Sequence, residues 1–236
     1  MTWLNRRPLA CAFAAGALIA LAGCTSVPDK ANFDPALFQR QPAEATFEER
    51  VAVLADPAAM EMTVTGERVS GGSEAAGLYA PVQMPIGRIV HEAALAAFAD
   101  AFPGGAPAVE RAGAEPGAPT VALRVAQYDY RDRLQYVVPL LIPFGGLLVF
   151  EKWQLDLQLT IELRLLDVDG AVLWSNVYDS GLRIWEPQKR PFLHAPEKHF
   201  EGLARLTHET ALALMRTAAR DVGEWLRNER LRERAL

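Results

Sequence analysis

The strictest constraint on the fold is a strict alternation of apolar and polar residues between Trp153 and Leu165. The apolar positions are Trp153, Leu155, Leu157, Leu159, Ile161, Leu163 and Leu165, and the positions between them are Gln154, Asp156, Gln158, Thr160, Glu162 and Arg164. Successive side chains of a strand point to opposite faces, so this period of two predicts a β-strand with one buried and one solvated face. Such a strand is typical of an antiparallel sheet that is covered on one side only.

Three further segments are predicted to form strands of the same sheet. Val121, Leu123 and Val125 alternate with smaller or polar residues and predict a strand with one buried face. Asp167 to Gly170 has the composition of a tight turn, so residues 171–178 are expected to return as a hairpin partner. A loosely alternating segment, residues 62–69, predicts a short first strand.

Two segments have the period of a helix. From Pro85 to Phe102 the apolar residues form one stripe, and the glycines that follow stop the helix. Residues 196–229 form a second, longer amphipathic segment with a charged tail. The inner stripes are predicted to be Ile86, Ile89, Val90, Ala93, Ala97, Phe98 and Phe102 in the first helix, and Phe200, Leu203, Thr207, Ala211, Leu214, Ala218, Val222 and Trp225 in the second.

The predicted order is therefore strand, helix, strand, strand, strand, helix. Two amphipathic helices can cover the apolar face of the strands, which predicts an α+β fold, a two-layer sandwich. Its sheet is expected to be mostly antiparallel and four-stranded, with both helices on one face. We assign this single domain to residues 57–236, and we expect residues 24–56 to form a tether whose Phe33, Phe38 and Phe47 fix part of it to the domain.

The N-terminus predicts export. Arg6 and Arg7 precede an apolar stretch, residues 9–22, which ends in small residues, and this is the pattern of a signal peptide covering residues 1–23. An ordinary secretory signal is one alternative. A membrane-spanning anchor is another, but the stretch is shorter than the roughly 20 residues that a bilayer requires.

The sequence Leu21-Ala22-Gly23-Cys24 resembles the lipobox of bacterial lipoproteins. That resemblance implies acylation of the Cys24 thiol, cleavage before it, and acylation of the new amino terminus, so that Cys24 anchors the protein in a membrane. Thr25 follows the cysteine where a retained lipoprotein has Asp, which implies sorting to the outer membrane. Several acyl chains together give stable anchoring, whereas one binds only marginally.

Charge and cysteine content exclude two classes of protein. Cleavage would remove two of the 24 basic residues and none of the 29 acidic ones, which leaves a net charge of −7. We therefore expect no nucleic-acid partner. The only cysteines are Cys11, within the signal, and Cys24, so the mature chain cannot form an internal disulfide.

The most apolar part of the mature sequence is residues 136–150. Pro139, Pro143 and the Gly145–Gly146 pair interrupt it, so it suits neither a long helix nor a membrane span. In one interpretation it forms two strand ends joined by a simple turn. In another, which is compatible with the first, the turn projects from the domain as an apolar contact for a partner protein or a membrane. The predicted partner-binding residues are Leu140, Leu141, Ile142, Phe144, Leu147 and Leu148, with Arg131 and Arg133 of the preceding segment "YDYRDR" beside them.

No set of residues predicts catalysis, a metal site or a cofactor. His91 lacks a second histidine at helical spacing, and His194 and His199 flank a proline without a further ligand at regular spacing. Asp167 and Asp169 are explained by their turn. We therefore expect that the protein is not an enzyme.

The order of elements, together with the lipobox, resembles small bacterial outer-membrane lipoproteins, including the lipopolysaccharide-assembly lipoproteins and the auxiliary lipoproteins of lipid transporters. This implies a lipoprotein that faces the periplasm and serves as an accessory or docking subunit of an envelope transport or assembly machine. The partners would be the membrane, through Cys24, and an envelope protein. A regulator of peptidoglycan synthesis and a periplasmic hydrolase are the alternatives, the former limited by the short tether and the latter by the missing catalytic motif.

Overall fold

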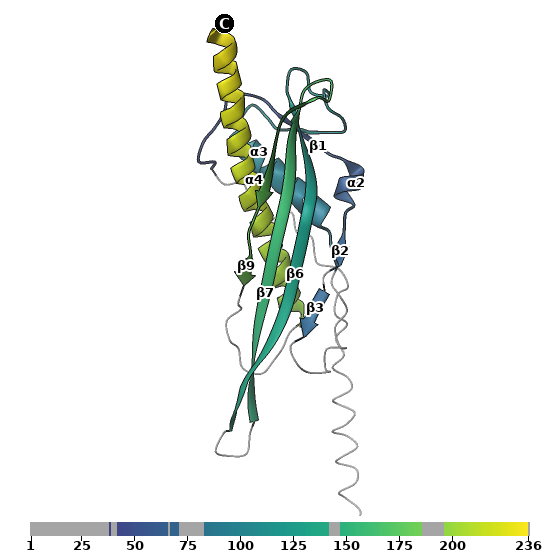
Figure 1. The fold of residues 1–236 in the computed structure, drawn as a ribbon, viewed down its shortest axis with the longest axis vertical. Coiled ribbons are helices and arrows are strands. Elements are labelled where there is room, and N and C mark those ends of the chain that lie inside the picture. The colour runs from purple at the N-terminus through teal and green to yellow at the C-terminus, as the bar shows by residue number, and fades with distance from the viewer. Residues whose placement is uncertain are drawn as a thin grey trace, which may run out of the picture.

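Two very long strands organise the molecule (Figure 1). The computed structural model describes residue 38 and residues 42–65, 67–70, 83–141, 147–185 and 196–235, and these form an α+β fold. β6 (Thr120–Leu141) and β7 (Leu147–Leu166) pair antiparallel along their whole length and follow the long axis of the molecule. The predicted strands at residues 121–126 and 153–165 are confirmed, and both are longer than predicted.

Short strands flank this pair on both edges. β1 and β3 pair with β6 in the parallel sense, β5 pairs parallel with β1, and β8 and β9 pair antiparallel with β7. The result is a mixed seven-stranded sheet, and β2 and β4 form a separate antiparallel pair. The bounds are β1 Ala52–Leu54, β2 Val64–Thr65, β3 Glu67–Ser70, β4 Gln83–Met84, β5 Ala108–Val109, β8 Val172–Asp179 and β9 Arg183–Trp185.

The α+β class is confirmed, but the expected four-stranded, mostly antiparallel sheet is only roughly matched, because the sheet has seven strands and β1, β3 and β5 add short parallel pairs to the antiparallel pairing of β6, β8 and β9 with β7. The missed strands β1, β5 and β9 have two or three residues, too few to show a period of two. They are held by pairing with neighbouring strands. The segment expected to form one strand, residues 62–69, instead divides between β2 and β3, which belong to different sheets.

Both predicted helices are present and pack on each other and on the long strands. α3 (Ile86–Ala101) contacts β6, and α4 (Pro196–Ala235) contacts β7 and β8. Pro85 is the N-cap of α3 rather than its first residue. The expected inner stripes are buried, except that Trp225 is half-buried and the Phe200 side chain lies outside the described part. A third helix of four residues, α2 (Pro57–Met60), packs on α3 and was not predicted.

A β-bulge in β6 decides which side chains enter the core. Val125 pairs with Ile161, whereas Gln127 pairs with Thr160, so Ala126 is an extra residue in β6. An extra residue exchanges the two faces of a strand. The buried side chains therefore change from odd to even positions, and Tyr128 and Tyr130 join the core between the sheet and the helices.

The turn predicted between β7 and β8 is confirmed. The Asp167 carboxylate accepts hydrogen bonds from the backbone amides of Asp169 (2.9 Å) and Ala171 (2.7 Å). Gly170 has a φ of 83°, a conformation that glycine adopts without strain. These contacts account for the Asp167 carboxylate as part of the turn.

The segment before the domain is packed more closely than a tether. Val51, Ala52 and Val53 are fully buried in and beside β1, and Phe47 belongs to the hydrophobic core. Phe38 is buried against His208 of α4, with ring centroids 4.9 Å apart. Two of the three aromatic residues expected to fix this segment therefore do so, and Phe33 lies outside the described residues.

Candidate functional site

The outer part of the β6–β7 hairpin is a two-stranded ribbon. β3 pairs with β6 as far as Leu134, and β9 pairs with β7 from Leu155 onward. Within the described part of the chain, no strand pairs with the ribbon beyond these points, that is, with residues 135–141 and 147–154. Figure 1 shows this ribbon extending past β3, β9 and both long helices.

Four of the predicted partner-binding residues meet at the end of this ribbon. Leu140 pairs with Leu148, and Leu141 pairs with Leu147. The register shifts between Val137 and Leu140, so the ribbon contains a second bulge at the position of Pro139. A proline cannot donate a ladder hydrogen bond, and bulges are among the few places in a sheet that accept one. Ile142, Phe144 and the lipidation residue Cys24 lie outside the described residues.

The two predicted arginines lie elsewhere, at the base of the ribbon. Arg131 is opposite Asp156 of β7 and Arg133 is opposite Gln154, and both also pair with β3. Nine residues separate Arg131 from Leu140, which corresponds to roughly 30 Å along a strand. The structure therefore divides the predicted set into an apolar end and a polar base. The neighbouring Tyr128 and Tyr130 are buried and belong to the core.

The uncovered face of the sheet is polar at this base. Asp156 is buried although it lies on this face, and it accepts a hydrogen bond from the Gln154 amide at 2.7 Å. Closer to the β7–β8 turn, Glu162 contacts both Arg124 (3.8 Å) and Arg164 (2.6 Å). These ion pairs are exposed to solvent, so they contribute little to stability. Around Glu162 this face is therefore polar and partly exposed to solvent.

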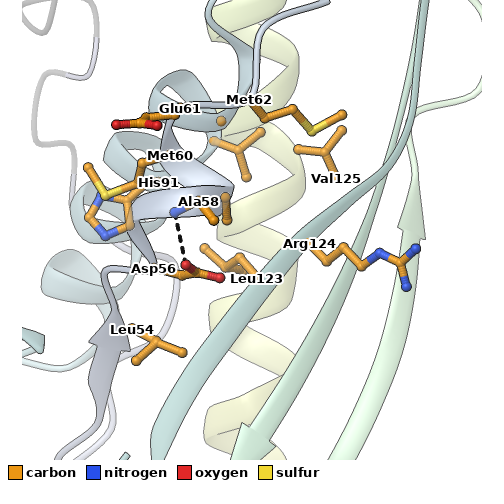
Figure 2. A pocket seen from close by; sticks show the side chains of 13 residues that line it. Leu54, Asp56, Ala58, Met60, Glu61, Met62, His91, Leu123, Arg124 and Val125 are labelled. Carbon is orange, nitrogen blue, oxygen red and sulfur yellow. Dashed lines mark hydrogen bonds between the residues drawn. The ribbon is translucent and has the colours of Figure 1, made fainter. Parts of the chain in front are cut away.

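A hollow of about 460 Å³ lies on the other side of the sheet, under α2 (Figure 2). It was not predicted, because its walls come from four separate segments. They are the end of β1, α2 with the residues after it, the first turns of α3, and β6. The lining residues are Leu54, Asp56, Ala58, Ala59, Met60, Glu61, Met62, Gly87, Val90, His91, Leu123, Arg124 and Val125.

Gly87 permits α2 to form one wall of this hollow. The Gly87 amide donates to the Met62 carbonyl at 3.1 Å, and a Cβ at residue 87 would lie only 1.9 Å from the Ala59 carbonyl oxygen. Asp56 caps α2 by accepting from the Ala58 amide at 3.0 Å, which Figure 2 shows as a dashed line. In that view the Arg124 guanidinium points away from the helices.

His91 is the buried polar residue of the hollow. Only 6% of its surface is exposed, and among the described residues neither ring nitrogen has a hydrogen-bond partner. Burial lowers the pKa of His91, and nearby Glu92 partly opposes this. The imidazole is therefore neutral at pH 7. Among the described residues that line the hollow, none is a Ser, Thr or Cys that this imidazole could activate as a nucleophile.

Two further surveys cover only the described ranges. There, no helix has the length and hydropathy that crossing a membrane requires. No three His, Cys, Asp or Glu side chains in those ranges are grouped as metal ligands.

Comparisons with known proteins identify no family. No family model matches the chain, and no curated protein matches its sequence. Among solved structures, a neuraminyllactose-binding hemagglutinin homolog from Helicobacter pylori aligns over 78% of this chain and 90% of its own, with 6% identity and a TM-score of 0.31. A DUF330 protein from Xanthomonas campestris aligns over 78% and 94%, with 13% identity and a TM-score of 0.33.

A minor lipoprotein from Acinetobacter baumannii is also similar. It aligns over 78% of this chain and 95% of its own, with 10% identity and a TM-score of 0.25. At these TM-scores and identities, the similarities decide neither the fold nor the function of this protein.

Proposed function

We propose that this protein is a nonenzymatic lipoprotein of the bacterial outer membrane that faces the periplasm and docks on an envelope transport or assembly machine. Cys24 would carry the lipid anchor. The end of the β6–β7 ribbon would make the protein contact, through Leu140, Leu141, Leu147 and Leu148 and the residues between them.

The observation that carries this proposal is the combination of an isolated ribbon with an apolar end. Residues 140–142, 144, 147 and 148 are all apolar, and the described ones among them pair only with each other. Contiguous apolar groups that lie outside a domain core are typical of protein or membrane contacts. A two-stranded hairpin is only marginally stable alone, so docking on a partner would also stabilise the ribbon.

The docked N-terminal segment favours a function close to the membrane. Cys24 precedes the buried Phe38 by 14 residues, which span at most about 50 Å when fully extended. The predicted tether was longer, since it was expected to continue to residue 56. A regulator of peptidoglycan synthesis must reach inward from the outer membrane, and the shorter span leaves less room for that alternative.

The test is a crosslinking pulldown from native envelopes with the full-length chain. Leu140→Asp plus Leu148→Asp places two charges at facing positions of the ribbon, so it should abolish recovery of one defined envelope protein. Leu231→Asp is the matched control, because Leu231 is an exposed leucine near the end of α4, which Figure 1 shows on the opposite side of the molecule from the ribbon.

Thermal unfolding of each variant separates docking from folding. The ribbon variant should keep a cooperative transition close to that of the wild type, since the ribbon lies outside the core. An unchanged set of crosslinked proteins, or loss of the cooperative transition, would contradict the proposed docking site.

A further inference from the structure

The hollow under α2 has the size and the walls of a small-molecule site. Its volume of about 460 Å³ lies within the range of roughly 300–1,000 Å³ that is typical of ligand pockets. Most of its large side chains are apolar, and these are Leu54, Met60, Met62, Val90, Leu123 and Val125. Leu54, Leu123 and Val125 are only half-buried, so part of this apolar surface remains available to a ligand.

His91 supplies the hollow with a polar group that lacks a partner. Its ring is buried, and among the described residues neither ring nitrogen makes a hydrogen bond. Nearly all buried polar groups in proteins are paired, because an unpaired one destabilises the fold. A neutral imidazole offers one N–H donor and one acceptor nitrogen. A ligand hydroxyl suits either nitrogen, because it both donates and accepts.

Met60 lies next to the face of α3 that carries His91. Gly87 precedes His91 by four residues and is therefore on the same face of the helix. The Met60 carbonyl oxygen would be 2.9 Å from a Cβ at residue 87, which places Met60 beside this face. In Figure 2 the Met60 side chain points toward the His91 ring. A methionine side chain is unbranched and flexible, so it can turn aside for a ligand while α2 stays folded.

The charges around the hollow favour an uncharged ligand. Asp56 and Glu61 are the carboxylates of its lining. Arg124 is the one Lys or Arg in the described lining, and its guanidinium pairs with Glu162 at 3.8 Å on the uncovered face of the sheet. An anionic ligand would therefore lose water without gaining a free cation, which is costly. A cationic group would also lose water, and the Asp56 carboxylate already caps α2.

We propose that this hollow binds a small, uncharged apolar molecule that carries one hydroxyl group. The apolar body lies against Leu123 and Val125 of β6, and the hydroxyl forms a hydrogen bond with His91. The two methionines adapt to the shape of the body, because thioether side chains fill irregular spaces. Val125 and Leu140 are 15 residues apart on β6, roughly 50 Å along the strand, so this site is independent of the proposed docking site.

Fluorescence titration of the full-length chain with 2-naphthol tests the site. This probe has an apolar aromatic body and one hydroxyl, and as a phenol it is uncharged at pH 7. In 2-methylnaphthalene a methyl group replaces the hydroxyl, and in 2-naphthoate a carboxylate replaces it. The wild type should bind 2-naphthol at one site and should bind 2-naphthoate at least tenfold more weakly.

His91→Leu removes the hydrogen-bonding group and keeps the hollow apolar. The affinity for 2-naphthol should fall roughly tenfold relative to the affinity for 2-methylnaphthalene, which corresponds to the loss of one hydrogen bond. A purely structural role of His91 would change both affinities by the same factor, so equal changes would overturn its assignment to the ligand hydroxyl.

Two variants that fill the hollow locate the binding. Val125→Trp should abolish binding of 2-naphthol, whereas Val177→Trp is the matched control on exposed β8 and should bind as the wild type does. Met62→Trp repeats the block at a position that is 37% exposed, where a larger side chain disturbs the core less. No binding by the wild type, equal binding of 2-naphthoate, or unchanged binding in both blocking variants would overturn the proposal.

Discussion

The ring of Phe47 packs against the backbone of Gly223, so closely that a Cβ at residue 223 would lie 2.3 Å from the Phe47 Cδ2 atom. Glycine inside a helix costs about 1 kcal/mol relative to alanine. Here it allows the N-terminal segment to dock on α4, where the Arg227 guanidinium also lies over the Phe47 ring at 5.0 Å. This contact, with the burial of Val51 and Val53, ties the segment before residue 57 to the hydrophobic core.

Gly223→Ala is expected to destabilise the protein. The new methyl group overlaps the Phe47 ring, and overpacking of this kind costs typically 1–3 kcal/mol, more than the helix propensity returns. In a Phe47→Ala background the overlap is absent, so the same substitution should become neutral or stabilising by up to about 1 kcal/mol. Urea unfolding of the wild type, the two single variants and the double variant measures this double-mutant cycle. Additive effects of the two substitutions would contradict the contact.

The buried pair Tyr128 and Thr207 should respond asymmetrically to mutation. Their hydroxyl oxygens are 2.9 Å apart, and the Thr207 hydroxyl also donates to the Leu203 carbonyl at 2.9 Å. Tyr128→Phe leaves Thr207 with that second partner and should cost about 1 kcal/mol. Thr207→Val removes the hydrogen-bond partner of the buried Tyr128 hydroxyl. It should cost more, about 1–3 kcal/mol beyond any change in packing. Equal losses in urea unfolding would contradict this arrangement.

Stability should decrease in mild acid because of His91. Burial lowers the pKa of His91 in the folded state, so the unfolded chain binds a proton at a higher pH than the folded chain does. The contribution is fully present above the unfolded value of about 6.5 and is lost as the pH falls below that value and through the lower pKa of the folded state. His91→Gln removes this titration. The decrease in unfolding free energy between pH 7.5 and 5.5 should be smaller in the variant, and an identical decrease would show that His91 does not contribute.

Cys24→Ser tests the lipid anchor. The variant should fail to incorporate labelled palmitate, because the thiol that would carry the acyl group is absent. The wild type should be labelled and should fractionate with the outer membrane. Labelling of the variant at the level of the wild type would contradict acylation at this residue.

The alternation from Trp153 to Leu165 determined one whole strand and its buried face. Leu155, Leu157, Leu159, Ile161, Leu163 and Leu165 are all fully buried in the structure. The apolar stripes of α3 and α4 and the turn at Asp167 could also be predicted from the sequence. A helix, a half-buried strand and a tight turn each leave a periodic or compositional pattern in consecutive residues.

Other features depend on partners distant in the sequence. The bulge at Ala126 moved Tyr128 and Tyr130 into the core, and it is defined only by the register against β7. Strands as short as β1 and β5 exist because neighbouring strands supply their hydrogen bonds, β6 to β1 and β1 to β5. The hollow at His91 draws its walls from four segments.

The sequence by itself determined the apolar periodicity of the long elements, the predicted lipidation at Cys24 and the apolar composition of residues 136–150. Tertiary structure alone decided that Leu140 and Leu148 meet at the end of a ribbon while Arg131 remains at its base. It also left Val177 exposed on an open edge. Local periodicity specifies which face of an element is apolar, but only the packing of the whole chain specifies which apolar faces are covered.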